Sequence, residues 1–97
     1  MPLTTKEVLE TLKAQKPYLA ERFGVIKLAL FGSYARGDFN TESDIDLLVE
    51  LKQKDFKMRF YLREYLESIF KRKVDVAYFD SVRPFAKQFV EKDIIHA

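Results

Sequence analysis

The chain has 97 residues, of which 47% are hydrophobic and 33% charged, a composition typical of one folded domain. Lys and Arg number 17 against 15 Asp and Glu, and a net charge of +2 does not predict binding to nucleic acid or to an anionic membrane. Without cysteine, disulfides, a thiolate nucleophile and cysteine-based zinc sites are excluded. No apolar run approaches the roughly 20 residues of a membrane span or the roughly 7–15 of a signal peptide, so we expect one cytoplasmic domain over residues 1–97.

The first predicted element is a helix that ends before Gly24. Thr4 and Glu7 fit a capping box, in which each side chain accepts a hydrogen bond from an amide that the helix leaves unpaired. Apolar residues follow at helical spacing, and Gly24 is typical of a C-terminal stop. Pro17 has no amide hydrogen, so we expect it to kink or restart the helix.

The rest of the chain alternates short apolar strands with segments of helical periodicity. In chain order we expect a strand over Val25–Phe31, a polar loop over Gly32–Ser43, a strand over Ile45–Leu51, a helix over Asp55–Phe70, a strand over Val74–Tyr78 and a helix from about Pro84 to Asp93. Helices that alternate with a small sheet indicate a single-domain α/β fold in two or three layers. We expect a mixed sheet of three or slightly more strands, flanked by about four helices.

The informative segment is 31–50, FGSYARGDFNTESDIDLLVE, in which Asp44 and Asp46 are two residues apart. On a strand, that spacing puts both carboxylates on one face and turns Ile45 and Leu47 toward the core. Two like charges side by side repel unless a cation lies between them, and carboxylate oxygens suit Mg²⁺. The alternative is a solvent-exposed edge on which two aspartates only keep the protein soluble.

Gly32 and Ser33 directly follow the first predicted strand. A glycine there lets backbone amides approach a phosphate closely, and a serine hydroxyl can donate a hydrogen bond to it. An ordinary turn at the end of the strand is the alternative. Two familiar motifs do not fit, because a P-loop needs lysine where Asp38 stands and an EF-hand needs glycine at Ser43 and glutamate at Val49.

The whole pattern, GS followed by ten residues and then DID, resembles the signature of the DNA polymerase β-like nucleotidyltransferases. The flanking sequences FGSYARGD and SDIDLLVE look like the minimal nucleotidyltransferase (MNT) branch, the antitoxin half of HEPN–MNT toxin–antitoxin pairs. That superfamily has a third carboxylate on a later strand, and Asp75 stands in a matching place. The resemblance covers nearly the whole chain.

The resemblance implies a Mg²⁺-dependent enzyme that transfers AMP, or another nucleoside monophosphate, from ATP or another nucleoside triphosphate to a hydroxyl group. Gly32 and Ser33 would hold the triphosphate. Two metal ions would be bound by Asp44, Asp46 and Asp75, and these three residues would carry catalysis. Asp75 would also help to deprotonate the hydroxyl group.

The partner that the resemblance implies is a HEPN-type toxin bearing the acceptor hydroxyl. Neither a membrane nor direct binding of nucleic acid is expected, and a homo-oligomer stays open. The alternative function is a non-catalytic binding module that neutralises a HEPN ribonuclease by contact.

Two residues of the loop have weaker predictions. Arg36 either binds a phosphate, to which a guanidinium can donate two hydrogen bonds, or ties the loop down to Asp38 or Glu42. For Tyr34 we expect an exposed loop tyrosine rather than one that stacks on a base.

Three other features are predicted to play no part in the site. His96 is expected in a frayed tail, and Lys71-Arg72-Lys73 in a solvated turn. Most aromatic side chains must fill the core of so small a domain, and a minority left exposed would form a patch for a partner. The aromatics concerned are Phe56, Phe60, Tyr61, Tyr65, Phe70, Phe85 and Phe89.

Overall fold

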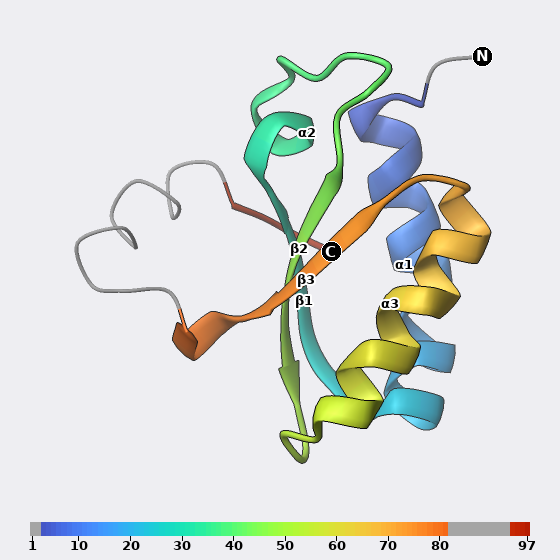
Figure 1. Cartoon of the computed structure of the whole chain (residues 1–97), viewed down its shortest axis with the longest axis vertical. Coiled ribbons are helices and arrows are strands. Elements are labelled where there is room, and N and C mark those ends of the chain that lie inside the picture. The colour runs from blue at the N-terminus through green and yellow to red at the C-terminus, as the bar shows by residue number, and fades with distance from the viewer. Residues whose placement is uncertain (1–2, 82–93) are drawn as a thin grey trace.

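The computed structural model describes residues 3–81 and 94–97, and Figure 1 shows their elements coloured in chain order. The elements are α1 (Thr5–Phe23), β1 (Val25–Phe31), α2 (Gly32–Arg36), β2 (Ile45–Leu51), α3 (Phe56–Phe70), β3 (Val74–Tyr78), the 3₁₀ turn η1 (Phe79–Ser81) and β4 (Ile95–His96). The predicted helix from about Pro84 to Asp93 lies outside the described residues.

The strands form one mixed sheet in the order β3-β2-β1-β4. β1 runs antiparallel to both of its neighbours, whereas β2 and β3 are parallel. A parallel pair cannot be joined by a tight turn, and α3 supplies the crossover between β2 and β3. The prediction of a small α/β fold with a mixed sheet is confirmed, with three helices in the described part of the chain.

α1 begins and ends where the sequence predicts. The Thr4 hydroxyl accepts from the amide of Glu7, whose side chain accepts from the Thr4 amide, and Gly24 ends the helix in the left-handed conformation. The expected restart at Pro17 is wrong, because α1 continues through this residue as one helix. Leu12 and Leu19, on either side of Pro17, are both fully buried. Their packing holds together a helix in which an interior proline costs about 3 kcal/mol or more.

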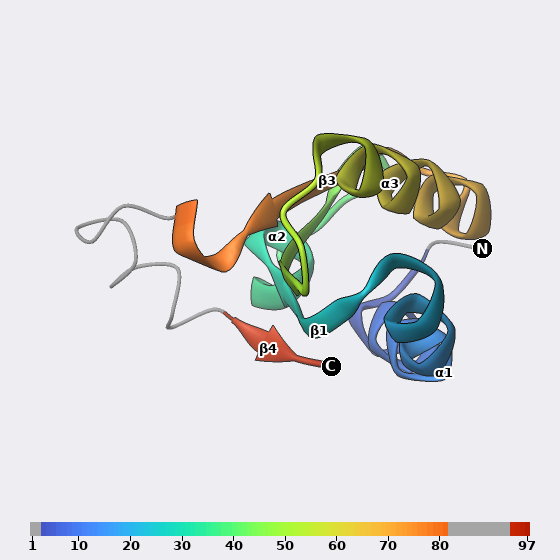
Figure 2. The ribbon, with the colours of Figure 1, turned by 90° about the horizontal axis from the view of Figure 1, so that it is seen from below.

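α1 and α3 pack against each other on one face of the sheet, as Figure 2 shows from below. Alternate residues of β2 point toward these helices, and Ile45, Leu47 and Val49 are fully buried, as the alternation in the sequence predicts. The same alternation turns Asp46 to the opposite face. The core between sheet and helices comprises Val8, Leu12, Leu19, Phe23, Val25, Leu28, Leu30, Tyr34, Ile45, Leu47, Val49, Leu51, Leu62, Leu66, Val74 and Val76.

Two short elements were not predicted. The five residues of α2 lie inside the segment expected to be a polar loop. His96, expected in a frayed tail, belongs to β4, where it pairs with Ala29 of β1 and stacks its ring on Phe79 with the centroids 5.9 Å apart. A strand of two residues has no periodicity to read, so only the pairing with β1 defines it. Within residues 3–81 and 94–97, no helix is long and apolar enough to cross a membrane.

Candidate functional site

Gly32 brings the backbone at the end of β1 against the carboxylate of Asp46. Phe31, the last residue of β1, pairs with Asp46 of β2, so the next residue of the chain, Gly32, lies beside the Asp46 side chain. The φ angle of Gly32 is 75°, in the left-handed region that favours glycine. A Cβ atom on Gly32 would also collide with the Asp46 carboxylate. Glycine is therefore required here both for its conformation and for the space it leaves.

Asp46 and Asp75 are direct partners in the parallel register of β2 and β3. Burial, followed by the negative charges of Asp75 and Asp44, raises the pKa of Asp46 to about 6, against the opposing charge of Arg36. A hydrogen bond between the side chains of Asp46 and Asp75 adds to the rise in pKa. The fold thus gathers the three aspartates singled out in the sequence into one negative cluster, with Asp46 at its centre.

The cluster has the chemistry of a divalent-cation site but not a complete set of ligands. Asp44 lies just before β2, and its Oδ2 atom is 3.8 Å from Nζ of Lys73. Among residues 3–81 and 94–97, no three carboxylate or imidazole side chains converge closely enough to hold a metal ion. Asp46 and Asp75 nevertheless offer adjacent hard oxygen donors, and a cation would relieve their repulsion. Asp46 and Asp75 therefore provide two of the oxygen ligands that a divalent cation needs.

α2 and the turn after it hold Ser33 and Arg36 near this cluster. The carbonyl oxygen of Ser33 accepts from the amides of Gly37 and Asp38, at 2.9 and 3.1 Å. Nε of Arg36 donates to Oδ2 of Asp38 at 3.1 Å, and both side chains are exposed. Arg36 is thus tied to Asp38 in this structure, while its charge still acts on Asp46.

Arg72 holds the loop that leads to Asp44 through hydrogen bonds. The prediction that Arg72 lies in a solvated turn did not include this role. Its Nη1 atom lies 3.0 Å from the carbonyl oxygen of Thr41, 3.2 Å from that of Ser43 and 3.5 Å from that of Asn40. These carbonyl oxygens come from residues about thirty positions earlier, a contact that only the tertiary fold creates. A basic residue just before a strand was the only signal in the sequence.

Tyr34 is a core residue, so the expectation of an exposed loop tyrosine is wrong. Only 1% of its surface is exposed, and its ring stacks on Phe39 with the centroids 4.5 Å apart. The guanidinium of Arg72 lies 5.8 Å from the same ring. The Thr5 hydroxyl of α1 donates to the Tyr34 carbonyl oxygen at 2.5 Å. Because α2 turns the ring inward, Tyr34 joins the site to the core instead of presenting a face to a nucleobase.

The chain is similar over almost its whole length to proteins that carry nucleotidyltransferase names. Residues 12–96 match the model of a family described as the nucleotidyltransferase domain. A Methanocaldococcus jannaschii protein, provisionally named a protein adenylyltransferase, is 40% identical in an alignment of 97 positions that covers 96% of this chain and 97% of the relative. The protein adenylyltransferase MntA of Thermococcus cleftensis is 35% identical in an alignment of 95 positions that covers 97% of this chain and 96% of the relative.

Two solved structures have a similar fold. The first is provisionally described as a minimal nucleotidyltransferase, and it matches with a TM-score of 0.77 and 28% identity over 98% of this chain and 95% of its own. The second is the crystal structure of a toxin–antitoxin with AMP-PNP. One chain of it matches with a TM-score of 0.67 and 25% identity over 97% of this chain and 72% of its own.

Proposed function

Because the chain belongs to the nucleotidyltransferase domain family, we propose that it is a protein adenylyltransferase that moves AMP from ATP to a hydroxyl group of a partner protein. The family and the relatives establish an enzyme that transfers a nucleotide. The observation that carries the more specific proposal is the cluster of Asp46 and Asp75 beside Gly32. A domain that only covers its partner has no need of clustered, mutually repelling carboxylates.

Gly32 and Ser33 would bind the triphosphate of ATP. Without a side chain at Gly32, a phosphate can come close to the backbone at the start of α2, and the Ser33 hydroxyl can donate to a phosphate oxygen. Arg36 would give up its hydrogen bond to Asp38 and bind a phosphate instead. A guanidinium binds a phosphate through two parallel hydrogen bonds. The solved toxin–antitoxin with AMP-PNP, an analogue of ATP, supports this choice of nucleotide.

Asp44, Asp46 and Asp75 would hold Mg²⁺, two ions by resemblance to the superfamily. When bound, the ions would neutralise the negative charge that builds up on the reacting phosphate and on the leaving group. Asp46 and Asp75 are already adjacent, and Asp44 would turn from Lys73 toward the metal.

In the proposed reaction, the acceptor oxygen attacks the α-phosphorus of ATP and forms a phosphoester bond. The bond from that phosphorus to the oxygen bridging to the β-phosphate breaks, and pyrophosphate leaves. The hydroxyl proton passes to the carboxylate of Asp75, which is exposed and therefore open to an incoming acceptor. No Ser–His pair is needed, because this chemistry depends on positioning and on the neutralisation of charge.

The partner that we propose is a HEPN-type toxin that carries the acceptor hydroxyl on a tyrosine. The resemblance to the MNT branch and the match to a solved toxin–antitoxin support this partner. The alternative is that the chain neutralises such a toxin by contact alone, with an idle nucleotide site.

Incubation of the chain with ATP, Mg²⁺ and a HEPN-domain protein tests the proposal. ATP labelled at the α-phosphate should label the partner, whereas ATP labelled at the γ-phosphate should not, because that phosphate leaves in pyrophosphate. Label from the γ-phosphate would indicate a kinase and refute the proposed reaction. Label from neither position would favour neutralisation by contact.

A further inference from the structure

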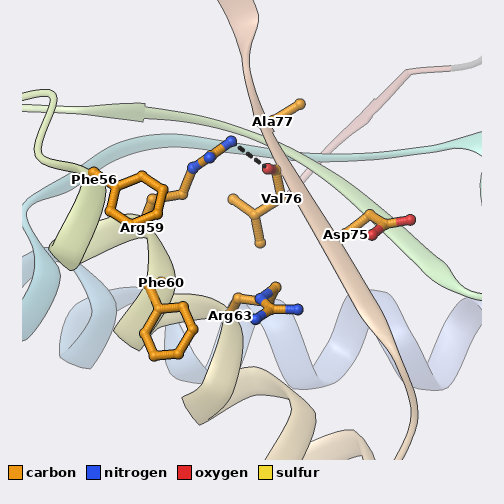
Figure 3. A pocket seen from close by; sticks show the side chains of 7 residues that line it. All are labelled: Phe56, Arg59, Phe60, Arg63, Asp75, Val76 and Ala77. Carbon is orange, nitrogen blue, oxygen red and sulfur yellow. Dashed lines mark hydrogen bonds between the residues drawn. The ribbon is translucent and has the colours of Figure 1, made fainter.

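The outer side of α3 exposes an unusual combination of aromatic and basic side chains. Phe56 is 74% and Phe60 40% exposed. Arg59 and Arg63 alternate with them, so that both rings and both guanidinium groups follow each other at helical spacing. Together with Asp75, Val76 and Ala77 of β3, these four residues line a groove of about 310 Å³, which Figure 3 shows from close by. We call it the α3–β3 groove.

The arginines are positioned by contacts within the groove. Arg59 donates through Nη1 to the carbonyl oxygen of Val76 at 3.3 Å, and its guanidinium carbon is 5.9 Å from the ring of Phe56. The guanidinium carbon of Arg63 is 5.3 Å from the ring of Phe60. Arg63 makes no hydrogen bond or ion pair with any other residue in 3–81 or 94–97. Its donors are therefore available to a ligand.

The groove ends beside the carboxylate cluster. β3 is an edge strand of the described sheet, and one of its residues, Asp75, lines the groove and also pairs with Asp46. In Figure 3 the Asp75 carboxylate points away from Arg59 and Arg63, on the other side of the β3 ribbon. A chain lying in the groove would thus reach the cluster by passing the edge of a single strand.

We propose that the α3–β3 groove binds an acidic, partly apolar segment of the acceptor protein and brings the acceptor hydroxyl to Asp75. This inference rests on the proposed function, to which it adds a docking site and the chemistry of the substrate segment. Two arginines against one carboxylate leave the groove positive, and arginine can bind a carboxylate through two hydrogen bonds. Phe56 and Phe60 offer apolar contact, and aromatic and arginine side chains are the types that dominate protein interfaces.

A nucleic acid is the poorer fit to this groove. Each phenylalanine ring already has a guanidinium over it, which restricts the stacking of a base. Protein is therefore the class of partner that the groove favours.

Two synthetic peptides test the proposal with the full chain. Both contain one tyrosine among leucines, flanked in one peptide by aspartates and glutamates and in the other by lysines. Fluorescence anisotropy gives the affinity for each peptide, and ATP labelled at the α-phosphate gives the rate of transfer. We expect the acidic peptide to bind about tenfold more tightly than the basic one, since hydrogen bonds between charged groups carry differences of this size.

Arg63→Glu is the test variant, and Lys57→Glu is its matched control. Lys57 is an exposed residue of the same helix that does not line the groove, so both variants change the net charge equally. Arg63→Glu should weaken binding of the acidic peptide about tenfold or more, and Lys57→Glu less than about twofold. Affinity for ATP, measured by titration calorimetry, should stay unchanged in both.

The results separate the groove from the proposed reaction. Equal losses in the two variants, equal affinity for the two peptides, or displacement of the acidic peptide by a single-stranded RNA would overturn the docking site. Binding that depends on Arg63 but is followed by no transfer of label would support the groove and contradict the proposed reaction. Transfer that proceeds equally in both variants would contradict the groove and support the reaction.

Discussion

Replacing Asp46 with Asn should stabilise the metal-free protein at neutral pH and leave its stability unchanged in acid. Folding raises the pKa of this carboxyl from 3.8 to about 6, so the native state favours the protonated form. The stability that a raised carboxyl pKa contributes is fully present below the unfolded-state value and is lost as the pH rises through the native one. The wild type should therefore lose stability between about pH 4 and pH 6, and the Asn variant should not.

The size of this effect follows from the shift in pKa. One pKa unit corresponds to about 1.36 kcal/mol, so the full shift would amount to about 3 kcal/mol. Asp46 is only partly buried, and solvent screening reduces that value to about 1 kcal/mol. For a domain of this length, about 1 kcal/mol corresponds to a rise in Tm of about 4–8 °C.

Thermal unfolding at about pH 4 and pH 7.5, with a chelator present, measures the difference. Glu50→Gln is the control, because Glu50 is an exposed carboxylate on the same strand. Mg²⁺ should then raise the Tm of the wild type and not that of Asp46→Asn, since a ligand stabilises only the state that binds it. A variant that is less stable than the wild type at pH 7.5, or a difference that is the same at both pH values, would refute the account of the cluster.

Three further substitutions test the site. Asp75→Asn should keep most of the affinity for ATP, measured by titration calorimetry, and lose about 10²–10⁴-fold in the rate of label transfer, because a general base contributes about that much. Transfer at the wild-type rate would remove Asp75 from the mechanism. Gly32→Ala should weaken ATP binding and lower the Tm more than Gly37→Ala does. Both glycines have a positive φ, but of these two only Gly32 would bring a Cβ atom against another side chain, that of Asp46. Equal losses of Tm in the two variants would contradict the predicted clash with Asp46. Arg72→Ala should lower the free energy of unfolding, measured with denaturant, by about 1–3 kcal/mol, because it leaves loop carbonyl oxygens unpaired. An unchanged denaturation midpoint would show that Arg72 does not stabilise the loop.

Local signals in the sequence were sufficient to predict most of the fold. The capping box at Thr4 and the stop at Gly24 define α1, and Asp55 caps α3 as the start of the predicted helix implies. The alternation around Ile45 predicted which side of β2 faces the core. These features depend on neighbours within a few residues, which a single sequence displays directly.

The features that the sequence did not reveal depend on contacts between distant residues. α2 is too short to show helical periodicity, and the pairing of His96 with β1 needs residues more than sixty positions apart. The hydrogen bonds of Arg72 to the loop carbonyl oxygens, and the contact of its guanidinium with the ring of Tyr34, join residues about thirty or more positions apart in the sequence. For the candidate site, the spacing of the motif singled out the residues, and only the register of β2 and β3 shows that Asp46 lies beside Asp75.

Intact-mass spectrometry of the partner tests the central claim most directly. A HEPN-domain protein is incubated with ATP, Mg²⁺ and either the wild type or Asp46→Asn, and the ribonuclease activity of the HEPN-domain protein is measured in the same samples. The account predicts that the wild type adds whole AMP units to the partner, that Asp46→Asn adds none, and that the loss of ribonuclease activity follows the modification. A partner that the wild type neutralises while its mass stays unchanged would contradict the account and identify the chain as a binding module.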